Sequence, residues 1–101
     1  MSTLIIEKAK LKNLKDLIYL LIDDDLGKNR ENLSETSFNN YKKSFMKILN
    51  DSNNEIFTMI LNDQIIGMMQ LTFIPGLSIE GMTRCQIESV RIKKDLSLIH
   101  I

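Results

Sequence analysis

The sequence contains very little cysteine, histidine and glycine, and each shortage argues against a kind of site. Cys85 is the only cysteine in 101 residues, so an internal disulfide and a multi-cysteine zinc site are both excluded. His100 is the only histidine and lies one residue from the end, which disfavours a Ser-His-Asp or Cys-His triad. Gly76 and Gly81 are too sparse for a phosphate-binding loop. A reducing, cytoplasmic setting is expected.

An excess of charge and long apolar runs are also missing. Thirteen basic residues balance thirteen acidic ones, so no net field favours nucleic acid or an anionic membrane. No window approaches the about 18 uninterrupted apolar residues of a membrane span, and the N-terminus does not resemble a signal peptide. We expect no nucleic-acid or membrane partner. With 101 residues, 44% of them hydrophobic, the chain is expected to form one domain around one modest core.

The first half of the chain predicts one strand and two helices. The short apolar run at 4–6 is typical of a strand, and residues 14–21 have helical spacing, with Asn13 as N-cap and Asp16 in a capping-box position. This helix is expected to end near the three aspartates at 23–25, because carboxylates are unfavourable at a helix C-terminus. After a polar loop at 28–35, a second helix follows, capped by a serine or threonine at 34–37. Its apolar stripe, interpreted as core, consists of Phe38, Tyr41, Phe45, Ile48 and Leu49.

The second half predicts three strands. The run 56–61 is apolar on both faces, which is typical of a strand covered on two sides. Asn62 and Asp63 form a turn into a returning strand at 65–74, which ends at Pro75 and Gly76. A bridge at 77–81 leads to a last strand at about 82–93, predicted to be antiparallel to the one before it. The order β-α-α-β-β-β predicts an α+β fold with a mainly antiparallel sheet.

Two segments of this half resemble a known family. They are Asp63–Ser78, DQIIGMMQLTFIPGLS, and Gln86–Ile92, QIESVRI. Both are similar to the GNAT superfamily of acetyl-CoA-dependent N-acetyltransferases, and the resemblance covers about residues 4 to 96. It implies a partial GNAT fold and acetyl transfer from acetyl-CoA to a primary amine, on either a small molecule or a protein.

The resemblance also implies roles for particular residues. The main chain of Val90, Arg91 and Ile92 would bind the pantetheine arm and orient the thioester carbonyl. Glu88 would deprotonate the incoming ammonium group, often through a water molecule in this family. The alternative for Glu88 is a strand carboxylate paired with Arg84 or Arg91.

The acidic run before the second helix is the expected border of the acceptor site. By analogy with the family, Asp24 and Asp25 would contact a cationic amine. The alternative is a solvated loop. A metal site is not expected, because adjacent aspartates diverge and no spaced set of oxygen ligands follows them.

The sequence departs from the family pattern after Asp95 and Leu96. A GNAT chain continues there with Arg or Gln, two residues, Gly, one residue, then Gly or Ala, and this loop holds the pyrophosphate. Here residues 97–101 do not match, and no glycine follows Gly81. We therefore interpret residues 1–96 as the N-terminal part of an acetyltransferase domain. The chain alone is expected to bind acetyl-CoA weakly or not at all and to be inactive.

The alternative interpretation is a shortened α+β domain without catalysis. Its last strand would lack a neighbour, and an exposed strand edge can pair with another chain. Such a domain would form a homodimer through this sheet edge, or a partner would complete the sheet.

Overall fold

The computed structural model describes residues 3–23, 31 and 34–93. In chain order its elements are β1 (Leu4–Lys8), the 3₁₀ helix η1 (Leu11–Asn13), α1 (Leu14–Ile22), α3 (Glu35–Leu49), β2 (Asn54–Leu61), β3 (Gln64–Pro75), α4 (Ser78–Gly81) and β4 (Thr83–Ile92). The predicted β-α-α-β-β-β order and the α+β class are confirmed. The two short helices η1 and α4 were not predicted.

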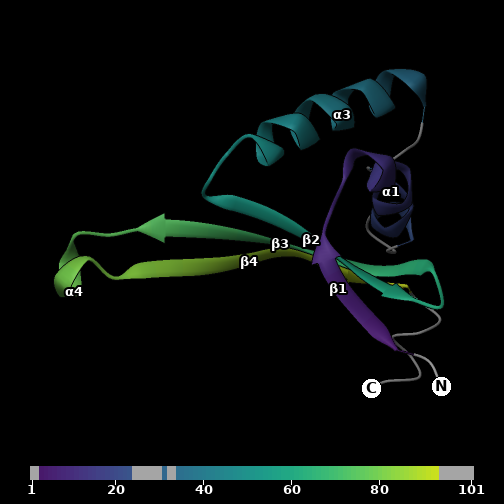
Figure 1. Cartoon of the computed structure of the whole chain (residues 1–101). Helices are drawn as coiled ribbons and strands as arrows, with labels where there is room; N and C mark the ends of the chain where they lie inside the picture. The colour runs from purple at the N-terminus through teal and green to yellow at the C-terminus, as the bar shows by residue number, and fades with distance from the viewer. Residues whose placement is uncertain (1–2, 24–30, 32–33, 94–101) are drawn as a thin grey trace.

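The four strands form one antiparallel sheet in the order β1-β2-β3-β4, and α1 and α3 lie on the same side of it (Figure 1). Ile56, Thr58 and Met68 are buried on the helix-covered face. The alternate residues of β2, Phe57 and Met59, point to the other face and are only half-buried. The expectation that this strand is covered on both sides is therefore not met within the described residues.

The core lies between the two helices and the helix-covered face of the sheet. Phe45 is buried, and Phe38 and Tyr41 are half-buried against the same core, which confirms the interpretation of these aromatic residues. Leu49, predicted on the same stripe, is instead 45% exposed, because it is the last residue of α3. The buried hydrophobic residues are Ala9, Leu14, Leu17, Ile18, Leu20, Phe45, Ile56 and Met68.

The two helices begin differently. Ser34 caps α3 as predicted, since its Oγ accepts a hydrogen bond from the amide of Ser37 at 3.2 Å. Asn13 precedes α1, but its side chain does not cap that helix. Its Oδ1 instead accepts a hydrogen bond from the backbone amide of Lys10 at 2.8 Å, one turn earlier. The prediction for Asn13 was wrong because the helical region begins with η1, before the apolar spacing starts.

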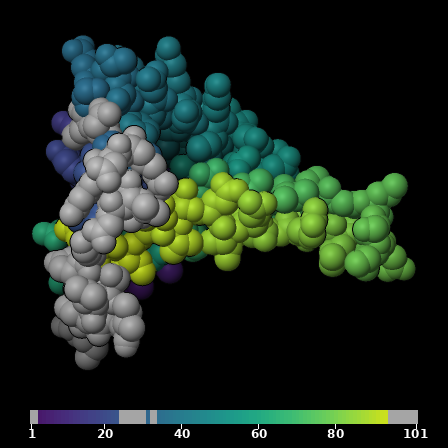
Figure 2. All heavy atoms as spheres, turned by 180° about the vertical axis from the view of Figure 1, so that it is seen from behind, coloured from purple at the N-terminus to yellow at the C-terminus, as the bar shows by residue number. Residues whose placement is uncertain are grey.

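The distal parts of β3 and β4 form a long arm that projects from the body (Figures 1 and 2). Thr72 is the last residue of β3 in register with β2, and the amide of the next residue, Phe73, donates to the Asn53 carbonyl oxygen at 2.7 Å. Beyond Phe73, β3 pairs only with β4. The arm turns at α4, where Ile79, Glu80 and Gly81 have left-handed backbone angles with φ of 51°, 57° and 80°. We define the arm as residues 71–87, and its base, at Leu71 and Thr72, still pairs with β2.

Candidate functional site

A β-bulge interrupts β4 at the predicted coenzyme platform. On β3, one residue separates the partners of Glu88 and Arg91, whereas on β4 two residues, Ser89 and Val90, lie between them. Ser89 has a φ of 51°, in the left-handed region. A two-against-one arrangement of this kind interrupts the ladder and bends the bulged strand.

The bulge determines the face on which each side chain lies. Side chains alternate along a regular strand, so Glu88 and Arg91, three positions apart, would point to opposite faces. With the extra residue, Glu88 pairs with Gln70 and Arg91 pairs with Met68, and these two partners share one face of β3. Met68 is buried in the core. Glu88 and Arg91 therefore both lie on the helix-covered face.

The Glu88 carboxylate is exposed and accepts a hydrogen bond from Gln86. Gln86 Nε2 lies 2.5 Å from Glu88 Oε1, and both residues are on the same face of β4. The alternative partners, Arg84 and Arg91, form no ion pair with Glu88. Arg91 Nη1 donates instead to the Val90 carbonyl oxygen at 2.9 Å.

Polar side chains continue from Glu88 across the sheet on the same face. Asn54 Oδ1 accepts hydrogen bonds from Gln70 Nε2 at 3.4 Å and from Thr72 Oγ1 at 2.6 Å. The resulting polar row, from β2 to β4, consists of Asn54, Gln70, Thr72, Gln86 and Glu88. It lies at the base of the arm and offers hydrogen-bonding groups next to the bulge.

β4 is an edge strand of the described sheet. Val90 and Ile92 are 47% and 43% exposed, and Arg91 is half-buried. The ladder resumes after the bulge, because the amide of Lys93 donates to the Ile66 carbonyl oxygen at 2.8 Å. The predicted platform thus begins inside the bulge, at Val90, and continues through the paired residues Arg91 and Ile92.

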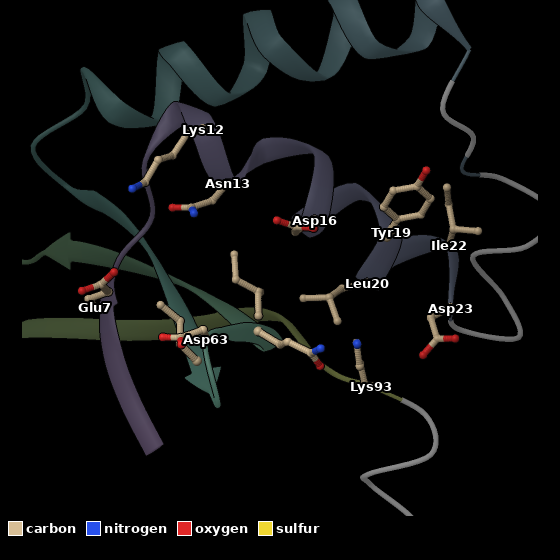
Figure 3. A pocket seen from close by; sticks show the side chains of 13 residues that line it. Glu7, Lys12, Asn13, Asp16, Tyr19, Leu20, Ile22, Asp23, Asp63 and Lys93 are labelled. Atoms are coloured by element: carbon tan, nitrogen blue, oxygen red, sulfur yellow. The ribbon is translucent and has the colours of Figure 1, made fainter. Parts of the chain in front are cut away.

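A cavity of about 1170 Å³ lies between α1 and the turn that joins β2 to β3, next to the end of β4 (Figure 3). Lys93 points from the end of β4 toward α1, whose C-cap residue Asp23 also lines the cavity (Figure 3). The charged lining residues are Glu7, Asp16, Asp23, Asp63, Lys12 and Lys93, so carboxylates outnumber ammonium groups by four to two.

The cavity and the predicted catalytic residue do not coincide. Glu88 and the platform residues do not line it, although Lys93 directly follows the platform. Asp24 and Asp25 lie outside the described residues, while their neighbour Asp23 lines the cavity.

Sequence reasoning missed several of the lining residues. The acidic run was a signal for Asp23, and Asp63 was recognised only as a turn residue. Glu7, Asp16 and Lys93 gave no signal, because only folding brings these three elements together.

In the described part of the chain, no group of three or more His, Cys, Asp or Glu side chains is arranged to hold a metal ion. No described helix has the length and apolar character needed to cross a membrane.

The fold is similar to those of solved acetyltransferases. The chain matches a transcriptional regulator from Bacillus halodurans with 33% identity and a TM-score of 0.83, covering 92% of this chain and 62% of that one. It matches a GNAT family acetyltransferase from Staphylococcus aureus with 21% identity and a TM-score of 0.70, covering 94% and 65%. A predicted acetyltransferase from Clostridium acetobutylicum, solved with acetyl-CoA, matches with 16% identity and a TM-score of 0.65, covering 92% and 62%.

These matches define the class of fold. No protein-family model and no curated protein matches the sequence. The structural matches extend over nearly the whole chain, and the chain spans less than two thirds of the length of each of these proteins. The chain therefore has a partial GNAT fold, as the sequence predicted.

Proposed function

We propose that this chain is the part of an acetyl-CoA-dependent N-acetyltransferase that presents the thioester to a primary amine. The observation that carries this proposal is the bulge at Ser89 and Val90 in an edge strand of a partial GNAT fold. An edge strand directs one row of backbone N–H and C=O groups outward. Fixed N–H donors stabilise a developing oxyanion without reorganising. The backbone of Val90, Arg91 and Ile92 is the proposed platform for the pantetheine arm.

Glu88 is the proposed general base. Its carboxylate is exposed two residues before Val90, so an amine approaching the platform can reach it directly or through water. Glu88 would first take one proton from the ammonium group of the acceptor, which leaves a neutral amine. The amine nitrogen would then bond to the acetyl carbon as the carbon–sulfur bond breaks, and the second proton that the nitrogen loses would pass to the departing sulfur. Acetyl-CoA supplies the acetyl group, and the coenzyme leaves as its thiol.

The acceptor is proposed to be a cationic amine. Four carboxylates and two ammonium groups line the cavity beside the end of β4, which favours a positively charged ligand. Asp24 and Asp25 directly follow Asp23 and remain the proposed extension of this acidic lining. The single cysteine supports a cytoplasmic location for the reaction.

The chain alone is proposed to bind acetyl-CoA weakly or not at all and to lack activity. Residues 97–101 differ from the family pattern of Arg or Gln, two residues, Gly, one residue, then Gly or Ala, and a loop of that pattern is expected to hold the pyrophosphate.

Amide chemical shifts of the isotope-labelled chain test the platform. Millimolar acetyl-CoA is expected to shift the amides of Val90, Arg91 and Ile92, and pantetheine alone is expected to shift the same set. Adenosine 3′,5′-bisphosphate, the nucleotide end of the coenzyme, is the matched control and should leave them unchanged. An unresponsive β4 would refute the platform, and tight, saturable binding by calorimetry would refute weak affinity.

The role of Glu88 is tested in a longer protein. A chimera joins residues 1–93 to the remaining C-terminal part of the S. aureus acetyltransferase. Glu88→Gln is expected to lower kcat about 100-fold or more, the usual contribution of a general base. Glu80→Gln, an exposed carboxylate at the tip of the arm, is the matched control. Equal kcat values for the two variants would remove Glu88 from the mechanism.

A second candidate function is a non-catalytic domain that associates through its sheet edge. It is favoured by the position of β4 at the edge and by the exposed apolar side chains Ile87, Val90 and Ile92 along it. A stable dimer by sedimentation, together with unchanged β4 amides in acetyl-CoA, would support this function over the first.

A further inference from the structure

The arm has one apolar face and one face of mixed character. Across β3 and β4, Leu71 pairs with Ile87 and Phe73 pairs with Cys85, and cross-strand partners share a face. We call these four residues the apolar arm face. The alternate positions belong to the opposite face, where Thr72 pairs with Gln86 and Ile74 pairs with Arg84. From this separation we propose that the apolar arm face and the arm tip form a contact surface for a second copy of this chain.

On the apolar arm face Leu71 and Phe73 are half-buried, and exposure rises toward Ile87, Cys85 and the tip. Ile87 is 61% exposed, and at the tip Leu77 and Ile79 are 96% and 73% exposed. The space-filling view shows the outer part of the arm projecting beyond α3 (Figure 2). A contiguous exposed apolar surface on a projecting element is typical of an interaction site.

The arm is also nearly free of charge. Between Asp63 and Glu88 the only charged residues are Glu80 and Arg84, although 26% of the whole chain is charged. Edge strands of monomers are usually protected by charged side chains, and interface cores are depleted of them. The arm follows the interface pattern.

The charge balance favours a second copy as the occupant. Glu80 and Arg84 have opposite signs, so two arms carry no net charge and do not repel each other. A two-fold contact uses the same surface on both chains, and an apolar surface without net charge is self-complementary in this sense. A strongly charged partner would find no complementary charge on the arm.

The exposed apolar area limits the strength of the contact. The most exposed apolar side chains of the arm are those of Leu77, Ile79, Ile87 and Met82, at 96%, 73%, 61% and 47%. A contact through so few side chains lies at the low end of interface sizes, where a specific interface buries about 1,000 Å² or more. The dimer is therefore expected to be reversible and dependent on concentration.

Sedimentation velocity of the full chain over a range of concentrations tests the contact. A monomer–dimer equilibrium is expected, and Ile87→Lys and Leu77→Lys should each weaken it about tenfold or more, because each places a charge in the contact. Gln86→Lys adds the same charge to the opposite face of the same strand and should leave the equilibrium unchanged. Circular dichroism establishes that each variant is folded.

Several results would overturn the proposal. They are a chain that stays monomeric at the highest concentration, larger aggregates in place of dimers, and a dimer that both arm variants leave intact. Equal weakening by Gln86→Lys would place the contact elsewhere.

Cys85 gives an independent measurement. It is exposed, lies on the apolar arm face and is the only cysteine. Its alkylation by iodoacetamide should slow as the chain concentration rises, and Leu77→Lys should abolish this dependence. A dimer whose Cys85 reacts as fast as in the monomer would contradict the assigned surface. These readouts do not involve acetyl-CoA, so their failure leaves the proposed catalytic function unaffected.

Discussion

Gly67 and Arg91 approach each other closely across the β3–β4 ladder, beside the bulge. A Cβ on Gly67 would lie 3.1 Å from the carbonyl oxygen of Arg91. On the other side it would lie 3.0 Å from Met59 Sδ. A side chain at position 67 would therefore require the Met59 side chain and the β4 backbone at the platform to move by a few tenths of an ångström.

Gly67→Ala is therefore expected to destabilise the chain by about 1–3 kcal/mol, the usual cost of overpacking. The measurement is urea unfolding followed by circular dichroism. The double variant with Met59→Ala removes the Sδ contact and should cost less than the sum of the two single changes. Strict additivity of the two changes would show that the contact with Met59 is not the source of the strain.

Replacing Ser89 tests the strained bulge. A non-glycine residue at a φ of 51° costs about 1–2 kcal/mol, so Ser89→Gly should be neutral or stabilising by up to that amount. Ser89→Val should destabilise, because a β-branched residue tolerates this conformation poorly. The free energy of unfolding in urea measures both. A valine variant as stable as the glycine variant would mean that the bulge is not held in this conformation.

Thr58→Val tests the hydrogen bond that joins the first two strands. Thr58 is fully buried, and its Oγ1 donates to the Glu7 carbonyl oxygen at 3.0 Å. Losing this donor while keeping the shape should cost about 1–2 kcal/mol. Thr72→Val, at a half-buried position, is the matched control and should cost less. The reverse order of the two unfolding free energies would contradict this account.

Ser34→Ala should destabilise α3 by about 1 kcal/mol, because the Ser37 amide loses its cap. Ser44→Ala, at an exposed position inside the same helix, should be neutral or slightly stabilising, since alanine has the higher helix propensity. Thermal unfolding of both variants provides the comparison. A Ser34→Ala variant as stable as the Ser44→Ala variant would show that the Ser34 side chain does not stabilise α3.

The sequence was sufficient for the element order because each element has its own periodicity. Phe45 lies on a helical stripe, and Asn62 and Asp63 mark the β2–β3 turn, where both have positive φ in the structure. That the Asn13 side chain would not cap α1 could not be foreseen, since η1 shifts the start of the helical region by one turn.

The sequence predicted which segments contribute to the site, but it did not predict how they are arranged in space. The residues around Glu88 indicated the last strand, but the face that Glu88 occupies depends on the register with β3 and on the bulge. The lining of the cavity was even harder to predict from the sequence. Asp16, Asp63 and Lys93 come from three elements, and no local pattern links them.

Three strands of the sheet pair with neighbours in the sequence, whereas β1 pairs with a strand that is distant in the sequence. This difference affects the order in which the strands are expected to fold. β2, β3 and β4 follow one another as hairpins, so their contacts close short loops. β1 instead pairs with β2 across the whole helical half of the chain, Leu4 with Leu61. Closing that long loop carries the largest entropic penalty, so β1 is expected to dock last. During synthesis on the ribosome, β1 therefore has no partner until β2 has emerged.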